Sequence, residues 1–224
     1  LASAIVALGV PEEKIAVVPT GVEPAIFHPR DRAEARTTLG LSPGPLVLVA
    51  ARLSPEKGIM HLLAAMSLAG ERGFFRLVIV GDGVQRRELE QQVRRHGLDD
   101  RVRFDGFQPE ARMPLYYSAA DLFCLPSLAE GWPDVLMESF ACGCPVVASA
   151  VGGVPEIVAL TGAGLTVPPA SPAALARGLE EALARGWDRR EIARAMDSFT
   201  IAGTARRYLE VCQEAAQSRG GSPT

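Results

Sequence analysis

Two basic residues, Arg52 and Lys57, stand five positions apart in the sequence, directly after a strongly apolar run. Between them lies Ser54-Pro55, which is typical of a helix start because serine caps helices and proline is favoured at the first helical position. A guanidinium, an ammonium and a helix N-terminus in one place would bind a diphosphate. The simpler alternative, that both residues are solvated surface charges, stays open at this point.

Two glutamates, Glu130 and Glu138, stand eight positions apart. We expect Glu130 in a loop and Glu138 about one turn inside a helix that starts near Asp134, within an apolar stretch. A carboxylate in such a stretch needs a partner, which the hydroxyls of a sugar or a ribose would supply. Ordinary surface charge is one alternative. A paired-carboxylate glycosidase is another, but it would leave Arg52 and Lys57 without a task.

Two glycine-containing turns follow other apolar runs, Gly81-Asp82-Gly83 and Gly152-Gly153. Glycine permits tight turns and close approach of the backbone to a ligand, although a tight turn into the next helix explains the second pair equally well. The dinucleotide fingerprint requires a third glycine at position 86, where this chain has Arg86. The sequence therefore argues against a redox Rossmann site.

The elements that must position these residues alternate between two patterns. Apolar runs of strand length occur at 46–51, 77–81, 122–126 and 146–149, with weaker candidates at 102–104 and 165–167. Helical spacing of apolar residues occurs between them, at 59–66, 89–93 and 175–183, and also at 32–39 and 208–215. Continuous apolar runs indicate strands that are buried on both faces. The pattern predicts an α/β fold, a Rossmann-like doubly wound parallel sheet with helices on both faces.

Such a sheet binds ligands beyond the carboxyl ends of its strands. The segments that follow the four strong runs are 52–58, 81–83, 127–133 and 149–153, and they hold most of the residues named above. Before the sheet, residues 1–8 read as the end of a helix, and Ile15–Pro19 predicts a further short strand ahead of a proline-rich linker.

The composition excludes several classes of protein. The chain has 224 residues, 23 basic against 26 acidic, and 48% hydrophobic residues, which indicates a folded protein without the basic surface of a nucleic-acid binder. No apolar run approaches the roughly 18 residues of a membrane span. Three scattered histidines and four cysteines without paired spacing do not suggest a metal site. The cysteine usage favours reduced thiols in the cytoplasm.

Taken in order, these motifs resemble the donor-binding C-terminal domain of retaining GT-B glycosyltransferases of family 4, the glycosyl transferases group 1 type. The resemblance spans roughly residues 15–215 and rests on segments 18–22, 51–58, 81–83, 102–107, 120–123, 130–138, 141–149 and 151–156. Two departures stand out. Trp132-Pro133 replaces the Phe-Gly that follows the first glycine in many relatives, which leaves the sugar specificity open, and Thr20 replaces a frequent asparagine.

The resemblance implies a nucleoside-diphosphate sugar (UDP, GDP or ADP) as substrate, with no cofactor and no metal. Arg52 and Lys57 would hold the diphosphate, Glu130 would contact the transferred sugar, and Glu138 would hold the ribose. We count Arg52, Lys57 and Glu130 as the expected catalytic residues. Further donor contacts are implied for Gly81, Gly83, Gly106, Phe107, Gly131, Trp132, Pro133, Asp134, Val135 and Leu136, with Gly106 and Phe107 at the base.

The resemblance also implies a domain organisation. Residues 1–30 would be the tail of a missing N-terminal acceptor-binding domain and the crossover, 31–199 the donor-binding domain, 200–217 a helix that returns toward the missing domain, and 218–224 a frayed tail. Peripheral membrane association would arise only through the missing domain. We expect the isolated chain to be inactive as a hexosyltransferase.

Three other functions remain open from the sequence. They are a non-catalytic nucleotide-sugar binding module, a sugar-nucleotide epimerase or phosphorylase on the same fold, and an NAD- or FAD-dependent oxidoreductase. The absent third glycine speaks against the last of these.

Overall fold

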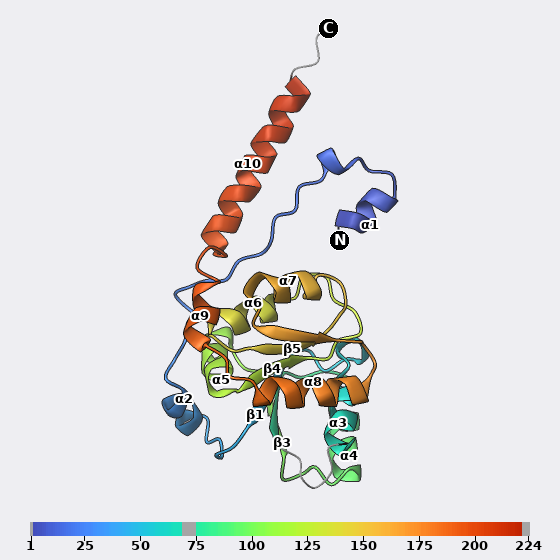
Figure 1. Ribbon diagram of the computed structural model, residues 1–224, viewed down its shortest axis with the longest axis vertical. Helices are drawn as coiled ribbons and strands as arrows, with labels where there is room; N and C mark the ends of the chain where they lie inside the picture. Colours follow the sequence, from blue (N-terminus) through green and yellow to red (C-terminus); the bar gives the residue numbers. More distant parts are fainter. Residues whose placement is uncertain (1, 69–74, 221–224) are drawn as a thin grey trace.

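The computed structural model describes residues 2–68 and 75–220 and shows a six-stranded sheet with helices on both faces (Figure 1). The strand order is β3-β2-β1-β4-β5-β6, and every neighbouring pair is parallel. The strands are β1 (Leu46–Ala50), β2 (Arg76–Val80), β3 (Val102–Gly106), β4 (Leu122–Leu125), β5 (Val146–Ser149) and β6 (Gly164–Val167). The prediction of a doubly wound Rossmann-like sheet is therefore confirmed.

Helices follow most of the strands and connect them across the two faces. They are α1 (Ala2–Ala7), α2 (Arg32–Thr38), α3 (Ile59–Leu68), α4 (Arg86–Arg95), α5 (Met113–Ala119), α6 (Asp134–Ala141), α7 (Val154–Thr161), α8 (Pro172–Ala184), α9 (Arg189–Arg194) and α10 (Ile201–Gly220). Three short 3-10 turns, η1 (Glu12–Lys14), η2 (Pro55–Lys57) and η3 (Glu110–Arg112), complete the elements.

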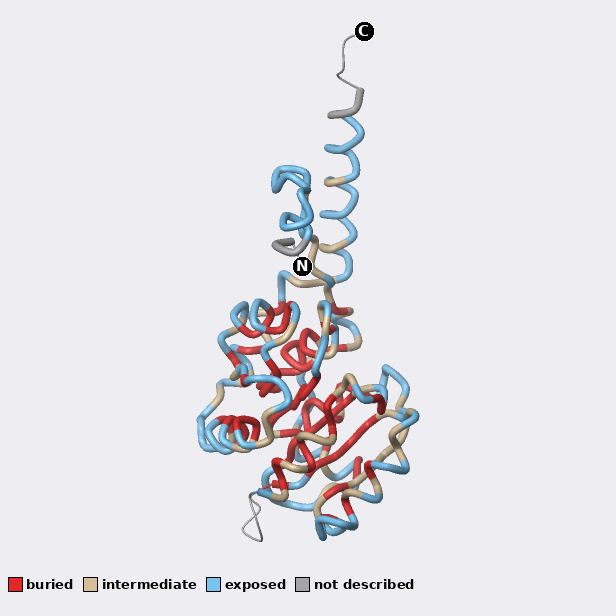
Figure 2. Tube along the Cα trace, turned by 90° about the vertical axis from the view of Figure 1, so that its right-hand side faces the viewer, coloured by how far each residue is buried: buried red, intermediate tan, exposed pale blue. Residues whose placement is uncertain are grey.

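The strands send alternate side chains into two separate hydrophobic layers. Val47 and Val49 of β1 pack with residues of α3, α4 and α8, whereas Leu48 and Ala50 pack with α2, α5, α6 and α7. Each fully buried aliphatic side chain contributes about 1.5–3 kcal/mol. Figure 2 shows the buried residues concentrated in the sheet and on the inner sides of these helices. Burial on both faces is the reason that the strands read as continuous apolar runs.

Arginine side chains hold helix α5 in place by hydrogen bonds. Asp121, just after α5, accepts hydrogen bonds of 2.8 Å from both Arg36 of α2 and the backbone N–H of Leu46. Arg189, at the start of α9, donates to the carbonyl of Tyr117 in α5 at 3.0 Å. Both arginines satisfy groups at the C-terminal end of α5, where cations and donors are favoured.

Two local predictions were wrong. The segment Ile15–Pro19 forms no strand, because no other strand lies beside it to pair with, and Val17 is 58% exposed. The Ser54 hydroxyl donates to Glu56 instead of capping a helix. Lys57 is the last residue of the 3-10 turn η2, and the next α-helix, α3, begins only at Ile59. By contrast, Ser171 caps α8, with its hydroxyl accepting from the N–H of Ala174.

The long helix α10 projects away from the sheet (Figure 1), and most of its described residues are exposed in Figure 2. It extends to Gly220, farther than the predicted 200–217, so residues 218–220 are not a tail, and 221–224 lie outside the described residues. Near its start, Val22 and Thr200 form an isolated parallel bridge. Within the described ranges, no helix combines the length and the hydrophobicity needed to cross a membrane.

Candidate functional site

A cleft of about 450 Å³ opens beside the carboxyl ends of β1 and β2. Most of its lining is apolar, and the residues that form it are Ala50, Ala51, Arg52, Val80, Gly81, Asp82, Phe107, Gln108, Met113, Tyr117, Val135 and Glu138. It lies where the strand order reverses, because β1 has β2 on one side and β4 on the other. Ligands of doubly wound sheets bind at this position. Arg52 and Glu138, which are distant in the sequence, thus share one cleft.

Glu138 points from α6 toward α5, where its Oε2 atom accepts a hydrogen bond of 2.7 Å from the Tyr117 hydroxyl. Burial raises the pKa of Glu138, and the nearby carboxylates of Asp134 and Glu110 raise it further, while the Tyr117 hydrogen bond acts in the opposite direction. The pKa of Tyr117 is raised well above its usual value, chiefly by burial and then by Glu138. Tyr117 therefore stays a hydrogen-bond donor throughout the working range of pH.

Lys57 and Glu130 form an ion pair, with 2.7 Å between Nζ and Oε1. The Ser127 hydroxyl donates to the same carboxylate oxygen at 2.6 Å. Neither Lys57 nor Glu130 lines the cleft; they belong to two adjoining loops. These loops approach closely at Gly58, where an added Cβ would lie 2.0 Å from the carbonyl oxygen of Pro126. The ion pair therefore sits in a tightly packed wall next to the cleft.

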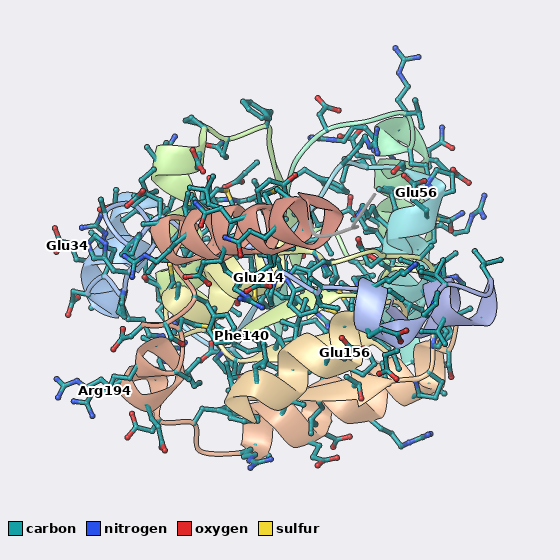
Figure 3. The ribbon with its side chains drawn as sticks, turned by 90° about the horizontal axis from the view of Figure 1, so that it is seen from above. Glu34, Glu56, Phe140, Glu156, Arg194 and Glu214 are labelled. Carbon is teal, nitrogen blue, oxygen red and sulfur yellow. The ribbon has the colours of Figure 1, made fainter. Side chains whose placement is uncertain are left out.

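Arg52, in contrast to Lys57, is exposed. Its side chain is 74% exposed, and its ion-pair partner is Glu56, at 3.7 Å. Glu56, labelled in Figure 3, lies on η2, and its backbone carbonyl accepts from the N–H of Leu128 at 2.8 Å. An exposed pair at this distance contributes little to stability. Arg52 is therefore available to a ligand at little cost to the fold.

Gly81 and Gly83 hold the segments after β1 and β2 together. Gly81 has φ +123°, and an added Cβ would lie 1.9 Å from the carbonyl oxygen of Ala51. A Cβ at Gly83 would lie 2.4 Å from the carbonyl oxygen of Leu53. Gly81 lines the cleft, whereas Gly83 does not. The close approach that these glycines allow is to the protein's own backbone.

The pair Gly152-Gly153 packs in the same manner against the loop that carries Glu130. An added Cβ at Gly152 would lie 1.9 Å from the carbonyl oxygen of Glu130, and one at Gly153 would lie 2.8 Å from the Trp132 ring. The N–H of Gly153 donates to the carbonyl of Gly131 at 2.8 Å. The Trp132 indole N–H is buried and has no hydrogen-bond partner among the described residues.

The predicted donor contacts around α6 fall into two groups. Val135 lines the cleft, while Pro133 and Leu136 are buried and do not line it. Asp134, the first residue of α6, accepts a hydrogen bond of 2.6 Å from the Thr20 hydroxyl. Gly131, which is exposed, and Trp132 lie in the loop before the helix and do not line the cleft.

At the other end of the cleft, β3 ends at Gly106, where φ is +66°. The next residue, Phe107, lines the cleft and is 79% exposed. An aromatic ring so exposed beside an apolar hollow is a surface on which a flat ligand group can stack. Within the described ranges, no group of three His, Cys, Asp or Glu residues is placed to hold a metal ion.

Seven lining residues were not predicted as site residues, namely Ala50, Ala51, Val80, Asp82, Gln108, Met113 and Tyr117. Asp82 follows the strand-end rule that found Gly81 and Gly83, so the sequence contained a signal for it. Tyr117 carries no such signal, because a tyrosine in an apolar helix is ordinary core. Its polar role is visible only where α5 and α6 pack together.

A doubly wound parallel sheet with a cleft where its strand order reverses defines a Rossmann-like α/β domain whose cleft lies at the usual ligand position of that fold. The chain belongs to the glycosyl transferases group 1 family, whose family model matches residues 31–198. It is 38% identical to a D-inositol 3-phosphate glycosyltransferase from Acidothermus cellulolyticus over 96% of this chain and 51% of that relative. The resemblance to the C-terminal domain of a GT-B glycosyltransferase is thereby confirmed.

Two solved structures illustrate the likeness of fold. Sucrose-phosphate synthase from Thermosynechococcus elongatus has a TM-score of 0.76 and 33% identity, and the match covers 92% of this chain and 53% of that protein. Anabaena Alr3699/HepE in complex with UDP has a TM-score of 0.74 and 27% identity over 99% of this chain and 61% of that protein. The chain spans about half the length of the curated relatives that it matches.

Proposed function

We propose that this chain is the donor-binding part of a retaining glycosyltransferase and binds a nucleoside-diphosphate sugar of the hexose type. The observation that carries the proposal is the shared cleft of Arg52 and Glu138 at the switch point of the sheet. The fold likeness to Anabaena Alr3699/HepE, which was solved with UDP, supports it. The bases considered are those of UDP, GDP and ADP.

The cleft provides a place for each part of such a donor. The base would lie against Phe107, at the end near Gly106, and the ribose hydroxyls would donate to Glu138. The diphosphate would then extend toward Arg52 and the N-terminus of α6, which favours negative charge. The sugar would meet the loop that carries Glu130.

The reaction would proceed by charge stabilisation. The bond between the sugar carbon and the diphosphate oxygen breaks, the acceptor hydroxyl forms the new bond on the same face, and a leaving phosphate oxygen takes the acceptor proton. Negative charge grows on the diphosphate during this step. Arg52 and Lys57 would bind this charge and so stabilise the transition state more than the ground state. Glu130 needs no covalent role and no metal is invoked.

The Lys57–Glu130 ion pair fits this scheme, because it leaves Lys57 fixed rather than mobile before a donor arrives. A preorganised ammonium loses little conformational freedom when a phosphate binds. Arg52, by contrast, must be ordered by the donor, since its side chain is 74% exposed. The two cations would therefore act at different stages, Lys57 as a fixed group and Arg52 as a group that closes over the diphosphate.

Calorimetric titration of the chain with UDP, GDP, ADP and UDP-glucose tests the proposal. At least one nucleoside diphosphate should bind, and Arg52→Ala and Lys57→Ala should each weaken binding by about tenfold or more, the loss expected for one charge-assisted hydrogen bond. Arg94→Ala, at an exposed position on α4 outside the cleft, is the matched control and should bind as the parent does. Failure to bind any of these nucleotides would refute the proposal.

Retention and metal independence require the complete enzyme. The anomeric configuration of the product, read by NMR, should equal that of the donor sugar. Transfer should persist when divalent cations are removed by a chelator. An inverted product would contradict the retaining assignment without affecting the donor-binding proposal.

A further inference from the structure

We propose that Tyr117 is a positioning residue for the ligand, one that holds the Glu138 carboxylate ionised and oriented for a vicinal diol. This inference rests on the proposed function, because the diol is that of the donor ribose. Its basis is the 2.7 Å hydrogen bond from the Tyr117 hydroxyl to Oε2 of Glu138, formed at the wall of the cleft.

The Tyr117 ring is fixed by the core. Its side chain is fully buried and packs edge-on against Phe123, with 5.4 Å between ring centroids, while the Phe27 ring lies on another side at 6.4 Å. The backbone of Tyr117 is held as well, through its carbonyl and Arg189. A tyrosine has only two side-chain torsions, so these contacts determine where its hydroxyl lies. Glu138 therefore accepts its hydrogen bond from a hydroxyl whose position is fixed.

The electrostatic surroundings of Glu138 otherwise oppose its ionisation. Burial is the largest effect, and the carboxylates of Asp134 on its own helix and Glu110 on η3 add repulsion, all of which raises its pKa. Asp82 and Arg52 also face the cleft, and Arg52 is largely in solvent. The Tyr117 hydroxyl is thus the buried group that favours the ionised form. An ionised carboxylate is the stronger acceptor for ligand hydroxyls.

The hydrogen bond also orients the carboxylate. Tyr117 donates to Oε2, and no side chain in the described ranges donates to Oε1. A carboxylate offers about four acceptor positions on its two oxygens, so most of them stay open to hydroxyls that enter the cleft. Without the tyrosine hydroxyl, the Glu138 side chain would be free to rotate within the cleft.

The chain contains a matched control in the adjacent residue. Tyr116 is 3% exposed, and its hydroxyl donates to a carboxylate oxygen of Asp105 at 2.8 Å. Tyr116 does not line the cleft. Tyr116→Phe therefore removes an equivalent hydroxyl from the same helix without removing a group that lines the cleft. Both variants keep the aromatic ring and its packing.

The experiment measures the affinity of the parent, Tyr117→Phe and Tyr116→Phe for UDP and for 2′-deoxy-UDP by calorimetry between about pH 5 and pH 8, above the ordinary glutamate pKa. The parent should prefer UDP. Tyr117→Phe should bind UDP about fivefold to tenfold more weakly and lose most of this preference, as expected for one hydrogen bond to a charged group. Tyr116→Phe should match the parent.

The pH profile separates positioning from a merely structural role. Affinity should fall as the pH drops through the pKa of Glu138, and the midpoint of this fall should move upward in Tyr117→Phe, since the group that favours ionisation is gone. If Tyr117→Phe keeps both the diol preference and the midpoint of the parent, the inference is overturned. Absence of UDP, GDP and ADP binding by the parent would instead overturn the proposed function.

If Tyr117→Phe is poorly folded, as judged by thermal unfolding, the Glu138→Gln variant provides the test. Glu138→Gln retains the shape of the side chain and stays neutral. It should lose the diol preference and the pH dependence by itself. A Glu138→Gln protein that still prefers UDP over 2′-deoxy-UDP would show that the Tyr117–Glu138 pair does not recognise the diol.

Discussion

The Lys57 ammonium lies 2.7 Å from Oε1 of Glu130, and the two side chains are only 22% and 8% exposed. Because the Ser127 hydroxyl bonds to the same oxygen, the carboxylate is fully compensated in the absence of a ligand. A half-buried ion pair of this kind is costly to break from one side, since the remaining charge is left without a partner.

Lys57→Met and Glu130→Gln should each lower the free energy of unfolding, by about 1–3 kcal/mol, because each leaves one desolvated group unpaired. The double variant should lose less than the sum of the two. Urea unfolding of all four proteins measures this double-mutant cycle. Additive losses would show that the pair contributes nothing beyond its separate side chains.

Glu138→Gln should make the chain more stable at pH 7 while it weakens nucleotide binding. The pKa of Glu138 is raised, chiefly by burial, so its contribution to stability is fully present below the unfolded value of about 4.3 and is lost as the pH rises through the folded value. A neutral glutamine removes that loss. The gain should therefore shrink on acidification to about pH 4, where the glutamate becomes neutral as well.

Urea unfolding at the two pH values provides the measurement for Glu138→Gln. Glu156→Gln on α7, at an exposed position labelled in Figure 3, is the control and should change stability little at either pH. Equal stability of Glu138→Gln and the parent at neutral pH would contradict the burial argument.

Gly58→Ala should be far more destabilising than Gly97→Ala, although the two glycines have nearly the same backbone angle, φ +64° and +63°. An added Cβ at Gly58 would lie 2.0 Å from the Pro126 carbonyl oxygen, whereas nothing lies within 4 Å of one at Gly97. The left-handed conformation alone costs about 1–2 kcal/mol, and the steric clash adds to it at Gly58 only. Thermal unfolding measures both, and equal losses would contradict the packing of these loops.

Trp187→Phe should cost about 1 kcal/mol more stability than Trp132→Phe, the typical value of one hydrogen bond. Both tryptophans are half-buried, but the Trp187 indole donates to the carbonyl of Ala182 at 2.8 Å, while the Trp132 indole N–H is buried without a partner among the described residues. The Arg185 guanidinium, 4.4 Å from the Trp187 ring, adds to the difference. A greater loss for Trp132→Phe would indicate that its indole nitrogen has an acceptor after all.

Most of the fold could be predicted, because strands that are buried on both faces appear in the sequence as continuous apolar runs. The run at 146–149 matches β5, and the other strong runs differ from β1, β2 and β4 only at their ends. The exception is Ile15–Pro19, which has strand-like residues but no neighbour. Pairing is a property of the whole sheet, so a local pattern does not determine it.

The site could be predicted only in part. The strand-end rule predicted Arg52 and Gly81, and the need of a carboxylate in an apolar helix for a partner predicted Glu138; the structure brings all three to one cleft. The strand-end rule did not separate a glycine that approaches a ligand from one that approaches the protein, and Gly152 proved to pack against the loop of Glu130. That distinction depends on which loops meet, and this information lies in tertiary packing rather than in the turn itself.

Because the strand order reverses between β1 and β4, both halves of the domain contribute residues to the cleft. Residues 46–106 supply the wall with Arg52, and the part from α5 onward supplies Tyr117 and Glu138. The halves meet along a short ladder in which Val47 pairs with Leu122 and Leu48 with Phe123. A chain emerging from the ribosome, N-terminus first, therefore cannot capture a ligand until β4 has docked. Ligand capture therefore reports that the two halves of the sheet have assembled.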